Sequence, residues 1–336
     1  MQKNSNKKSL FQNWIFSLIQ QLLTIALPLI TTPYLSRVLG ANQIGTYGYT
    51  TSIATYFILF GTLGISMYGQ REIAYRQDDF NKKSKLFWEM IILRLFSLSI
   101  SFILYFILFC RINEFSLFYK ILLLEIIANY FDINWFFQGI EEFDKTVIRN
   151  IIVKILGIIC IFIFVKTPND LPIYLLIYAL SVLIGNLSLW FYIPKYVKKV
   201  SLKDMKLSKH ILPIIILFLP QVAIQVYTVL DKTMIGAITN DMSLVGFYEQ
   251  AQKIVKTTLC IVGALQLVMN SRIAEAFSKK NNNKIISELE KSFSYVFLLA
   301  VPATFGLIAI AHLFVPWFYG DGYNDVINVI KWLSPI

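Results

Sequence analysis

Ionisable side chains lie inside long apolar blocks of this sequence, and any fold must accommodate their chemistry. A charged residue within a membrane-spanning helix costs roughly 2.5 to 3.5 kcal/mol on insertion scales, so it usually faces a partner or a water-filled cavity. Acidic and basic types occur in equal numbers, which would allow neutralisation by pairing. The residues are Glu89, Arg94, Glu125, Asp132, Lys154, Asp231, Lys232, Glu249, Lys253 and Lys256.

Three of these residues in the first half of the chain fall at a similar depth. With about 1.5 Å of rise per residue, Arg94, Lys154 and Asp132 lie roughly 9 to 12 Å from the inner ends of their helices. Glu125, Asn129 and Asp132 recur at i, i+4 and i+7, which predicts a polar stripe facing the bundle interior. Arg94 and Lys154 are therefore candidates for a substrate pathway, with a structural contact to Asp132 as the alternative.

In the second half, Asp231 and Lys232 lie near the outer end of one block, and Glu249 and Lys253 form an i, i+4 pair in the next. Lys256 lies about 18 Å along that second helix, too deep for its side chain to reach the surface. It either faces an aqueous cavity or belongs to a buried pair. Candidates for the substrate pathway here are Lys232, Lys253 and Lys256. The candidate carboxylates for ion coupling or pairing are Glu125, Asp132, Asp231 and Glu249.

Amides and prolines mark the two helices that open the halves. The amides near mid-membrane are Gln20, Gln21, Gln221 and Gln225, and the prolines are Pro28, Pro33, Pro213 and Pro220. Hydrogen bonds between helices explain such amides. Alternatively, the prolines let these helices bend and expose carbonyls to a cavity. Gln20 and Gln225 are therefore further candidates for the substrate pathway.

Enzymatic chemistry has little support. His210 and His312, the two histidines, are predicted at helix ends with no second metal ligand at a useful spacing, so interfacial positions are expected. No phosphate-binding loop for ATP is present. We therefore expect no enzymatic activity, metal or cofactor, and the net charge of +11 indicates topology rather than nucleic-acid binding.

The elements that must position these residues are membrane-spanning helices. Hydrophobic residues make up 56% of the 336 residues and charged residues 15%, in apolar blocks of the length that a bilayer requires. No cleavable signal is evident. The predicted spans cover 11–36, 44–69, 86–110, 115–138, 147–165, 171–193, 210–238, 244–270 and 291–315, and a tenth begins near 326. The predicted fold class is an all-α polytopic membrane protein.

Lysine and arginine are distributed unequally between alternate connections. One set of connections holds twenty-one of them and the other holds three, Arg37, Arg111 and Lys166. Because positive residues favour the cytoplasmic side, the N-terminus is predicted in the cytoplasm of a cell whose inner or plasma membrane holds the protein.

A basic stretch divides the chain into two halves that resemble each other. We predict a six-helix lobe over 1–193, a cytoplasmic connector over 194–209 and a partial second lobe over 210–336. Leu27-Pro28 and the later Ile44-Gly45-Thr46-Tyr47 of the first half are matched by Leu219-Pro220 and Val245-Gly246-Phe247-Tyr248 in the second. Duplicated halves are common in transporters. The second lobe has fewer spans than the first, so either the fold is asymmetric or the second lobe is shortened, and we favour a shortened copy.

Several stretches of the chain resemble the polysaccharide transporter family, the Wzx-type flippases of O-antigen and capsule repeat units. Their superfamily also contains drug antiporters and the lipid II flippase. The matching stretches are LPLITTPYLSRVLG from Leu27, IGTYGY from Ile44, LGISMYGQREIA from Leu63, NWFFQG from Asn134, DKTMIG from Asp231 and GFYEQAQKI from Gly246. Arg37 occupies a motif position near the predicted outer interface, where it could also serve only to anchor the loop.

The resemblance implies a MATE-like, two-lobed helical bundle that moves an undecaprenyl-diphosphate-linked oligosaccharide outward by alternating access. Coupling to a proton or sodium gradient, and contact with polysaccharide polymerase or export machinery, would follow from the same resemblance. A cation-coupled multidrug or metabolite antiporter is the alternative, and it predicts an acidic cavity around Glu125 and Asp132. A membrane-embedded polymerase or glycosyltransferase is disfavoured because every predicted outer loop is short.

Overall fold

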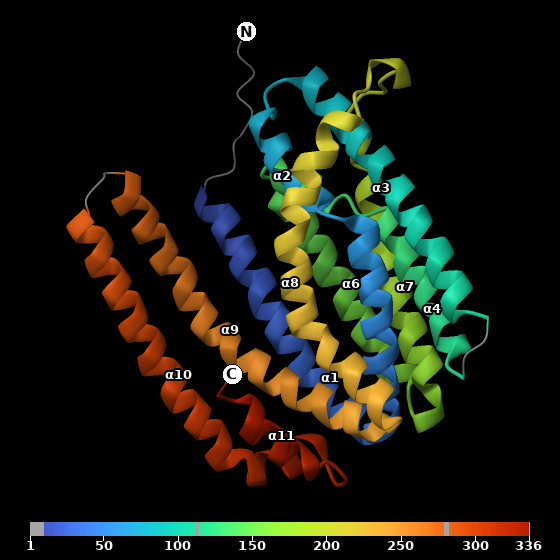
Figure 1. The fold of residues 1–336 in the computed structure, drawn as a ribbon, viewed down its shortest axis with the longest axis vertical. Helices are drawn as coiled ribbons and strands as arrows, with labels where there is room; N and C mark the ends of the chain where they lie inside the picture. The colour runs from blue at the N-terminus through green and yellow to red at the C-terminus, as the bar shows by residue number, and fades with distance from the viewer. Residues whose placement is uncertain (1–9, 112–113, 279–281, 336) are drawn as a thin grey trace. The chain divides into compact units, whose positions relative to one another are not determined.

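The computed structural model describes residues 10–111, 114–278 and 282–335, without the side chains of 10–25, 202 and most of 260–283. All regular secondary structure in these ranges is helical (Figure 1). The longer α-helices are α1 (Leu10–Thr62), α3 (Phe80–Phe109), α6 (Phe143–Phe164), α7 (Leu171–Trp190), α8 (Ser208–Thr239), α9 (Met242–Ser278) and α10 (Asn282–Tyr319). The shorter ones are α2 (Ile65–Tyr75), α4 (Ser116–Tyr130), α5 (Asn134–Gly139) and α11 (Asp325–Leu333), with 3-10 turns at Pro168–Asp170, Ile193–Lys195 and Leu202–Asp204.

Six helical stretches in the described ranges are long and apolar enough to cross a membrane. They are Ala26–Tyr75, Phe80–Phe109, Phe143–Phe164, Pro168–Lys195, Ser208–Thr239 and Lys284–Tyr319. The nine predicted spans exceed these six for three reasons. The first stretch contains two predicted spans, α4 has only 15 residues, and most of residues 260–270 in the predicted span 244–270 lie outside the side chains that the structure describes. The chain is a multi-pass, all-helical membrane protein.

Two predicted spans are interrupted in the structure, and this corrects the prediction of continuous helices over 44–69 and 115–138. The first is broken at Leu63, whose φ of 49° is left-handed, so that α2 begins as a separate helix. The second ends at Tyr130 and resumes as α5 at Asn134. Hydropathy alone does not reveal these breaks, because Leu63 is apolar and Asp132, the one charged residue at the second break, is flanked by Phe131 and Ile133.

Helix α1 contains its own break between the first two predicted spans. Gly40 has φ 75° and ψ 169°, which no α-helix contains. The prolines that marked the opening helix of each half lie inside helices, Pro28 and Pro33 in α1 and Pro213 and Pro220 in α8.

The helices form two compact units. Unit 1 comprises the described part of Met1–Leu27 together with Tyr47–Ile238, and unit 2 comprises Pro28–Thr46 and the described part of Thr239–Ile336. Helix α1 contributes residues to both. The lobes over 1–193 and 210–336, with their connector over 194–209, stay a prediction.

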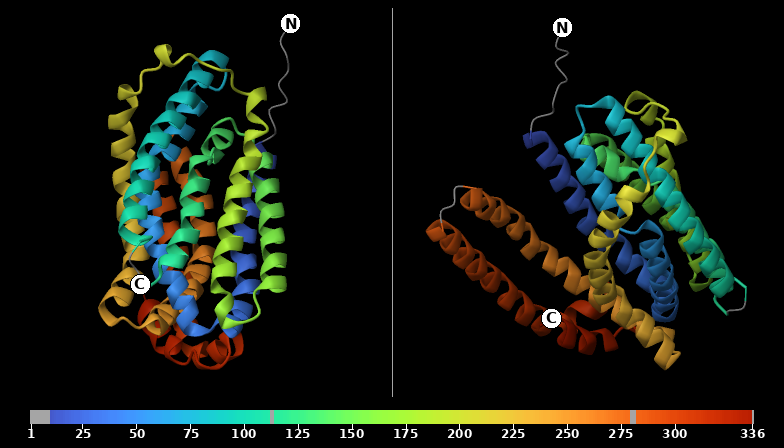
Figure 2. Two further views of the ribbon diagram at one scale, coloured as in Figure 1. Left: turned by 90° about the vertical axis from the view of Figure 1, so that its right-hand side faces the viewer. Right: turned by 45° about the horizontal axis from the view of Figure 1, so that its top comes forward.

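The core of unit 1 is aromatic and joins two of the stretches quoted above. Phe87 stacks on Trp135 with ring centroids 5.9 Å apart, and a Cβ on Gly69 would lie 2.6 Å from Trp135 Cε3. In return, a Cβ on Gly139 would lie 2.8 Å from the carbonyl oxygen of Gln70. The LGISMYGQREIA and NWFFQG stretches are therefore the two sides of one α2–α5 contact. Helix α7 packs against both α4 and α6 in the same unit (Figure 2).

Unit 2 is held together by tyrosines and by Arg37. The Tyr319 hydroxyl donates to the Gln250 carbonyl at 2.8 Å, and the Tyr323 hydroxyl donates to the Ser36 carbonyl at 3.0 Å. Arg37 Nη2 donates to the Trp317 carbonyl at 2.6 Å. The arginine of the PYLSRVLG stretch thus holds the last turn of α10, and its role as an anchor of its own loop stays a prediction.

Candidate functional site

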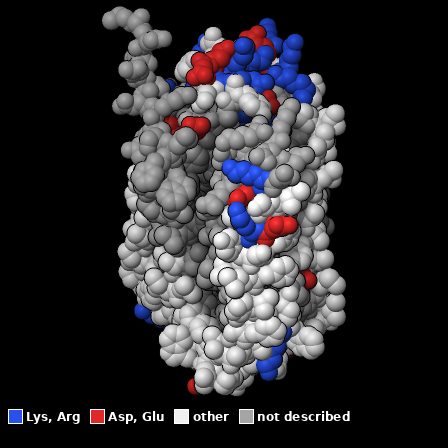
Figure 3. All heavy atoms as spheres, turned by 90° about the vertical axis from the view of Figure 1, so that its left-hand side faces the viewer, with Lys and Arg blue, Asp and Glu red and all other residues white. Residues whose placement is uncertain are grey.

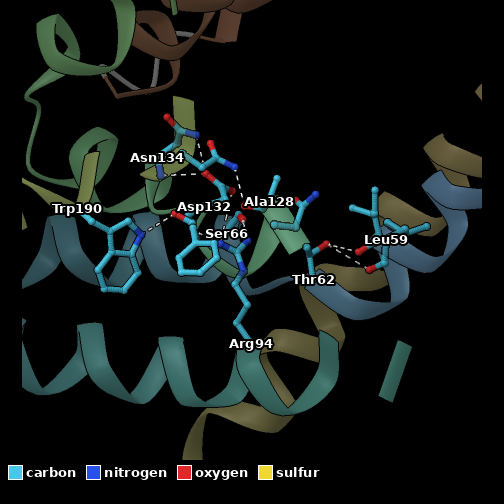
Figure 4. A network of polar contacts seen from close by, with 12 residues as sticks. Leu59, Thr62, Ser66, Arg94, Ala128, Asp132, Asn134 and Trp190 are labelled. Atoms are coloured by element: carbon cyan, nitrogen blue, oxygen red, sulfur yellow. Dashed lines mark hydrogen bonds and ion pairs between the residues drawn. The ribbon is translucent and has the colours of Figure 1, made fainter. Parts of the chain in front are cut away.

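The break between α4 and α5 is the centre of a polar network in unit 1 (Figure 4). A broken helix leaves carbonyl groups without intrahelical partners, and a membrane protein must satisfy them from elsewhere. Asn186 Nδ2 of α7 donates to the Ala128 carbonyl at 2.8 Å, and Trp190 Nε1, also of α7, donates to the Phe131 carbonyl at 2.8 Å. Side chains of a neighbouring helix therefore stabilise the break.

Arg94 of α3 occupies the middle of this network. Its side chain is 1% exposed, and its Nη1 donates to the Asp132 carbonyl and lies 3.4 Å from Asp132 Oδ2. Its Nη2 donates to Ser66 Oγ of α2 at 2.7 Å. The structure thus brings together two of the three residues that depth alone placed at one level. One guanidinium group connects α2, α3 and the α4–α5 break.

Arg149 of α6 extends the network on its other side. Asp132 Oδ1 accepts hydrogen bonds from the Asn134 backbone N–H at 3.0 Å and from Asn134 Nδ2 at 2.5 Å. The side-chain amide oxygen of Asn134, Oδ1, in turn accepts a hydrogen bond from Arg149 Nη2 at 2.8 Å. Arg149 Nη1 donates to Asn186 Oδ1 at 3.2 Å. Arg94 thus contacts the Asp132 carboxylate directly, and Arg149 is connected to it through the side-chain amide of Asn134.

The sequence analysis missed Arg149, Asn186 and Ser66. Arg149 was counted among the basic residues of the connections, and a lone serine or asparagine in an apolar block carries no distinctive signal. Asn134 is the first residue of the NWFFQG stretch, which resembles the family. Its place in that stretch is the signal from which this network could have been predicted.

Lys154 does not join Arg94 and Asp132. Its side chain is exposed on α6, with no hydrogen-bond or ion-pair partner among the residues that the structure describes. Arg149 and Lys154 are five residues apart, which places them about 140° apart around the helix axis. Equal depth therefore did not mean a shared face, and Arg149 points to the network in place of Lys154.

Glu125 lies one helical turn before Asn129 on α4 and is half-buried. Asn129 Nδ2 donates to the Glu125 backbone carbonyl at 2.9 Å, so the amide stabilises the helix rather than the carboxylate. Tyr178 of α7 and Tyr105 of α3 are close enough to interact electrostatically with the Glu125 carboxylate. The predicted polar stripe therefore faces other helices of unit 1.

The candidates on α8 lie apart from the network. Gln225 and Lys232 are half-buried, and Asp231 is exposed. Thr233 Oγ1, next in the chain, lies 2.8 Å from Ser52 Oγ of α1. Gln20 lies among the residues whose side chains are not described.

In unit 2, the predicted i, i+4 pair on α9 is present. Lys253 Nζ lies 3.5 Å from Glu249 Oε1, and Glu249 is buried. Lys256 follows with an exposed side chain.

A second buried polar group joins α2, α3 and α8 in unit 1. His210 Nε2 lies 2.9 Å from Glu89 Oε2, and His210 Nδ1 lies 2.7 Å from the Tyr68 hydroxyl. This geometry fits the tautomer in which Nε2–H donates to Glu89 and the Tyr68 O–H donates to Nδ1. His210 is 1% exposed and lies in the first turn of α8, and its position at the membrane interface stays a prediction. Among the described residues, no group of three or more His, Cys, Asp or Glu residues could hold a metal ion.

Comparison with known proteins gives two kinds of match. Residues 10–269 match the model of a family described as "Polysaccharide biosynthesis protein". The chain is 25% identical to the "Putative O-antigen transporter" of Escherichia coli (strain K12) over 338 aligned residues, 99% of this chain and 81% of that protein. It is 28% identical to a protein of the same name from Shigella dysenteriae over 146 residues, 43% of this chain and 37% of that one.

Among solved structures, the fold is similar to the inward-facing conformation of a multidrug resistance MATE family transporter of the MOP superfamily. The TM-score is 0.67 at 17% sequence identity, over 94% of this chain and 76% of that one. This likeness concerns the fold, which is MATE-like as the resemblance predicted.

Proposed function

The chain belongs to the polysaccharide biosynthesis protein family, and from this premise we propose that it is a flippase for lipid-linked oligosaccharides. Its substrate would be an undecaprenyl-diphosphate-linked repeat unit of O-antigen, capsule or exopolysaccharide, moved across the bacterial cytoplasmic membrane by alternating access. The observation that carries the proposal is the match to a relative named as an O-antigen transporter over 99% of this chain.

The chemistry of the substrate explains why cations in apolar helices matter. A diphosphate needs positive charge in a sheltered site, while the prenyl chain can stay in lipid. Lys154 supports this proposal because it is an exposed lysine on a helix apolar enough to cross a membrane. Arg94 and Arg149 have protein partners, so we propose that they shape the path rather than contact the diphosphate. Lys232, Lys253 and Lys256, with the amides Gln20 and Gln225, complete the proposed pathway.

Carboxylates would serve ion coupling to a proton or sodium gradient, or charge pairing. Asp132 and Glu249 have cationic partners, which favours pairing. Glu125 has tyrosines as its electrostatic neighbours and is the proposed coupling residue of unit 1. A cytoplasmic N-terminus, and contact with polymerase or export machinery, are further parts of the proposal.

The test is complementation in a bacterium that lacks its own O-antigen or capsule flippase, with surface polysaccharide measured at matched expression. The wild-type protein should restore the polymer, and Lys154→Ala and Lys256→Ala should reduce it. Lys166→Ala is the matched control, because Lys166 is also exposed and follows the end of α6. Equal loss in Lys154→Ala and the control would contradict the role of Lys154.

The alternative function is that of a cation-coupled multidrug or metabolite antiporter, which shares this fold. In the same cells it predicts no restoration of the polymer, together with drug resistance that depends on Glu125. Glu125→Gln separates the two readings, since the antiporter requires a carboxylate that binds and releases cations at this position.

A further inference from the structure

A basic pocket lies at one end of unit 1, away from the network around Arg94. Its volume is about 310 Å³. The residues that line it are Arg76, Lys82, Lys85, Leu86, Glu89 and Lys209. The four cations come from three places in the chain, the end of α2, the first two turns of α3 and the start of α8. Figure 3 shows Lys and Arg gathered, among Asp and Glu, chiefly at one end of the face it draws.

Topology alone does not explain this arrangement. The tendency of positive residues to remain on one side of a membrane requires lysine and arginine at this end, but not around one hollow. Lys198 and Lys199 satisfy the same tendency as exposed residues outside the pocket. The convergence of cations from three elements therefore needs a second cause.

The walls of the pocket are fixed by buried contacts. Glu89 turns its carboxylate inward, where Oε2 accepts from His210 Nε2 at 2.9 Å and Oε1 accepts from the Lys206 backbone N–H at 2.8 Å. These bonds hold the start of α8, and hence Lys209, against α3. On the other wall, Asp79 Oδ1 accepts from the Lys82 backbone N–H at 3.0 Å and starts α3 at a defined position. The fold thus holds the backbone that carries these cations in place, which lowers the loss of conformational entropy when a ligand binds.

The charges within the pocket are only partly compensated. Arg76 pairs with Glu72, and Lys82 Nζ lies 3.1 Å from Asp79 Oδ2 in a pair whose lysine is 72% exposed. The exposed Lys82–Asp79 pair contributes little, whereas the Arg76–Glu72 pair is partly buried, with side chains 34% and 13% exposed. Lys209 Nζ is 3.6 Å from Glu89 Oε2, beyond hydrogen-bond distance. Lys85 has no partner among the described residues, so its ammonium group is available to a ligand.

We propose that the Arg76–Lys82–Lys85–Lys209 pocket binds a phosphate-bearing anion. Lysine and arginine side chains bind phosphate oxygens through charge-assisted hydrogen bonds. Basic pockets between membrane helices recognise lipid phosphates. The phosphate can belong to an anionic lipid head group or to a free diphosphate. The proposal does not depend on the flippase function, because its test measures binding and not transport.

The test uses the full chain and follows its thermal unfolding midpoint, which rises when a ligand binds only the folded state. Inorganic pyrophosphate is titrated into protein in neutral detergent, against sodium chloride at equal ionic strength. In parallel, the protein is placed in vesicles of phosphatidylcholine alone or with phosphatidylglycerol. A rise with both probes, or with either one, supports the pocket and identifies the source of the phosphate.

Variants locate the effect. Lys85→Ala removes the cation without a partner and should shift the titration to about tenfold higher concentration, as expected for a lost charge-assisted hydrogen bond. Lys209→Ala is the second variant, and Lys199→Ala removes one exposed charge outside the pocket and should change nothing. The proposal is overturned if neither probe raises the midpoint, or if Lys199→Ala weakens the effect as much as the two pocket variants do.

Discussion

Gly45 and Gly246 face each other where residues 28–46 of α1 cross α9 in unit 2. A Cβ on Gly45 would lie 1.6 Å from the Met242 carbonyl oxygen, and a Cβ on Gly246 would lie 2.0 Å from the Ala41 carbonyl oxygen. Each carbonyl belongs to the residue four positions before the opposing glycine. The contact is therefore reciprocal, and the two similar stretches that begin at Ile44 and Val245 pack against each other through their glycines.

Gly246→Ala should destabilise the protein, because an added methyl group would overlap the Ala41 backbone, which has no rotamer by which to move away. Overpacking of this kind costs roughly 1 to 3 kcal/mol, and a backbone obstacle favours the upper end. The measurement is the thermal unfolding midpoint in detergent. Gly306→Ala is the control, because no atom lies within 4 Å of its added Cβ and it should be neutral or slightly stabilising. Equal effects of the two variants would contradict the close approach.

The sequence predicted the repeat but not the contact between its copies. Similar motifs in two halves indicate duplication, and duplication does not specify which surfaces meet. Gly69 and Gly139 show the same limit of sequence comparison. Each lies in a stretch that resembles the family, but its packing partner, Trp135 or the Gln70 carbonyl, lies in the other stretch. Close packing depends on the atoms opposite a residue, and hydropathy carries no information about them.

Arg94→Ala should be among the most destabilising single changes in unit 1. It removes the donors to the Asp132 carbonyl and to Ser66 and leaves the Asp132 carboxylate without its arginine partner. Breaking a buried pair costs about 3 to 5 kcal/mol. Arg71→Ala is the matched control, because Arg71 is exposed and lies 3.7 Å from Glu72. If Arg94→Ala abolished polysaccharide export without lowering the unfolding midpoint, Arg94 would act in the substrate path and not in the scaffold.

Depth along a helix could be estimated from the sequence, whereas rotation around its axis could not. The estimate was sufficient for Arg94 and Asp132 to be placed at one level. It failed for Lys154 because α6 presents Arg149 to the network, and the choice between two cations five residues apart depends on how α6 packs against α7. A broken fourth helix was equally hidden, since its freed carbonyls are satisfied by Asn186 and Trp190, more than fifty residues away in sequence.

Glu89 and His210 should show strong energetic coupling. Glu89→Gln, His210→Gln and the double variant form a cycle in which the interaction energy is the difference between the double change and the sum of the single changes. A buried hydrogen bond to a charged group predicts about 1.5 to 3 kcal/mol. The exposed Lys82–Asp79 pair gives a control cycle with coupling near zero. Additive effects of Glu89→Gln and His210→Gln would show that the 2.9 Å contact contributes nothing to stability.

Asp79 should make stability depend on pH at the start of α3. The hydrogen bond from the Lys82 backbone N–H, together with the Lys82 side chain, holds the pKa of the Asp79 carboxyl below its ordinary value. Because the pKa is lowered in the folded state, the ionised Asp79 carboxylate stabilises the folded protein fully above the unfolded-state pKa. This stabilisation is lost as pH falls through the folded-state pKa. The unfolding midpoint of the wild type should therefore fall more than that of Asp79→Asn between about pH 5 and pH 2. Asp78→Asn is the control and should follow the wild type, because Asp78 is exposed and makes no side-chain hydrogen bond to the start of α3. Identical pH profiles for all three proteins would contradict the role of Asp79 as the cap of α3.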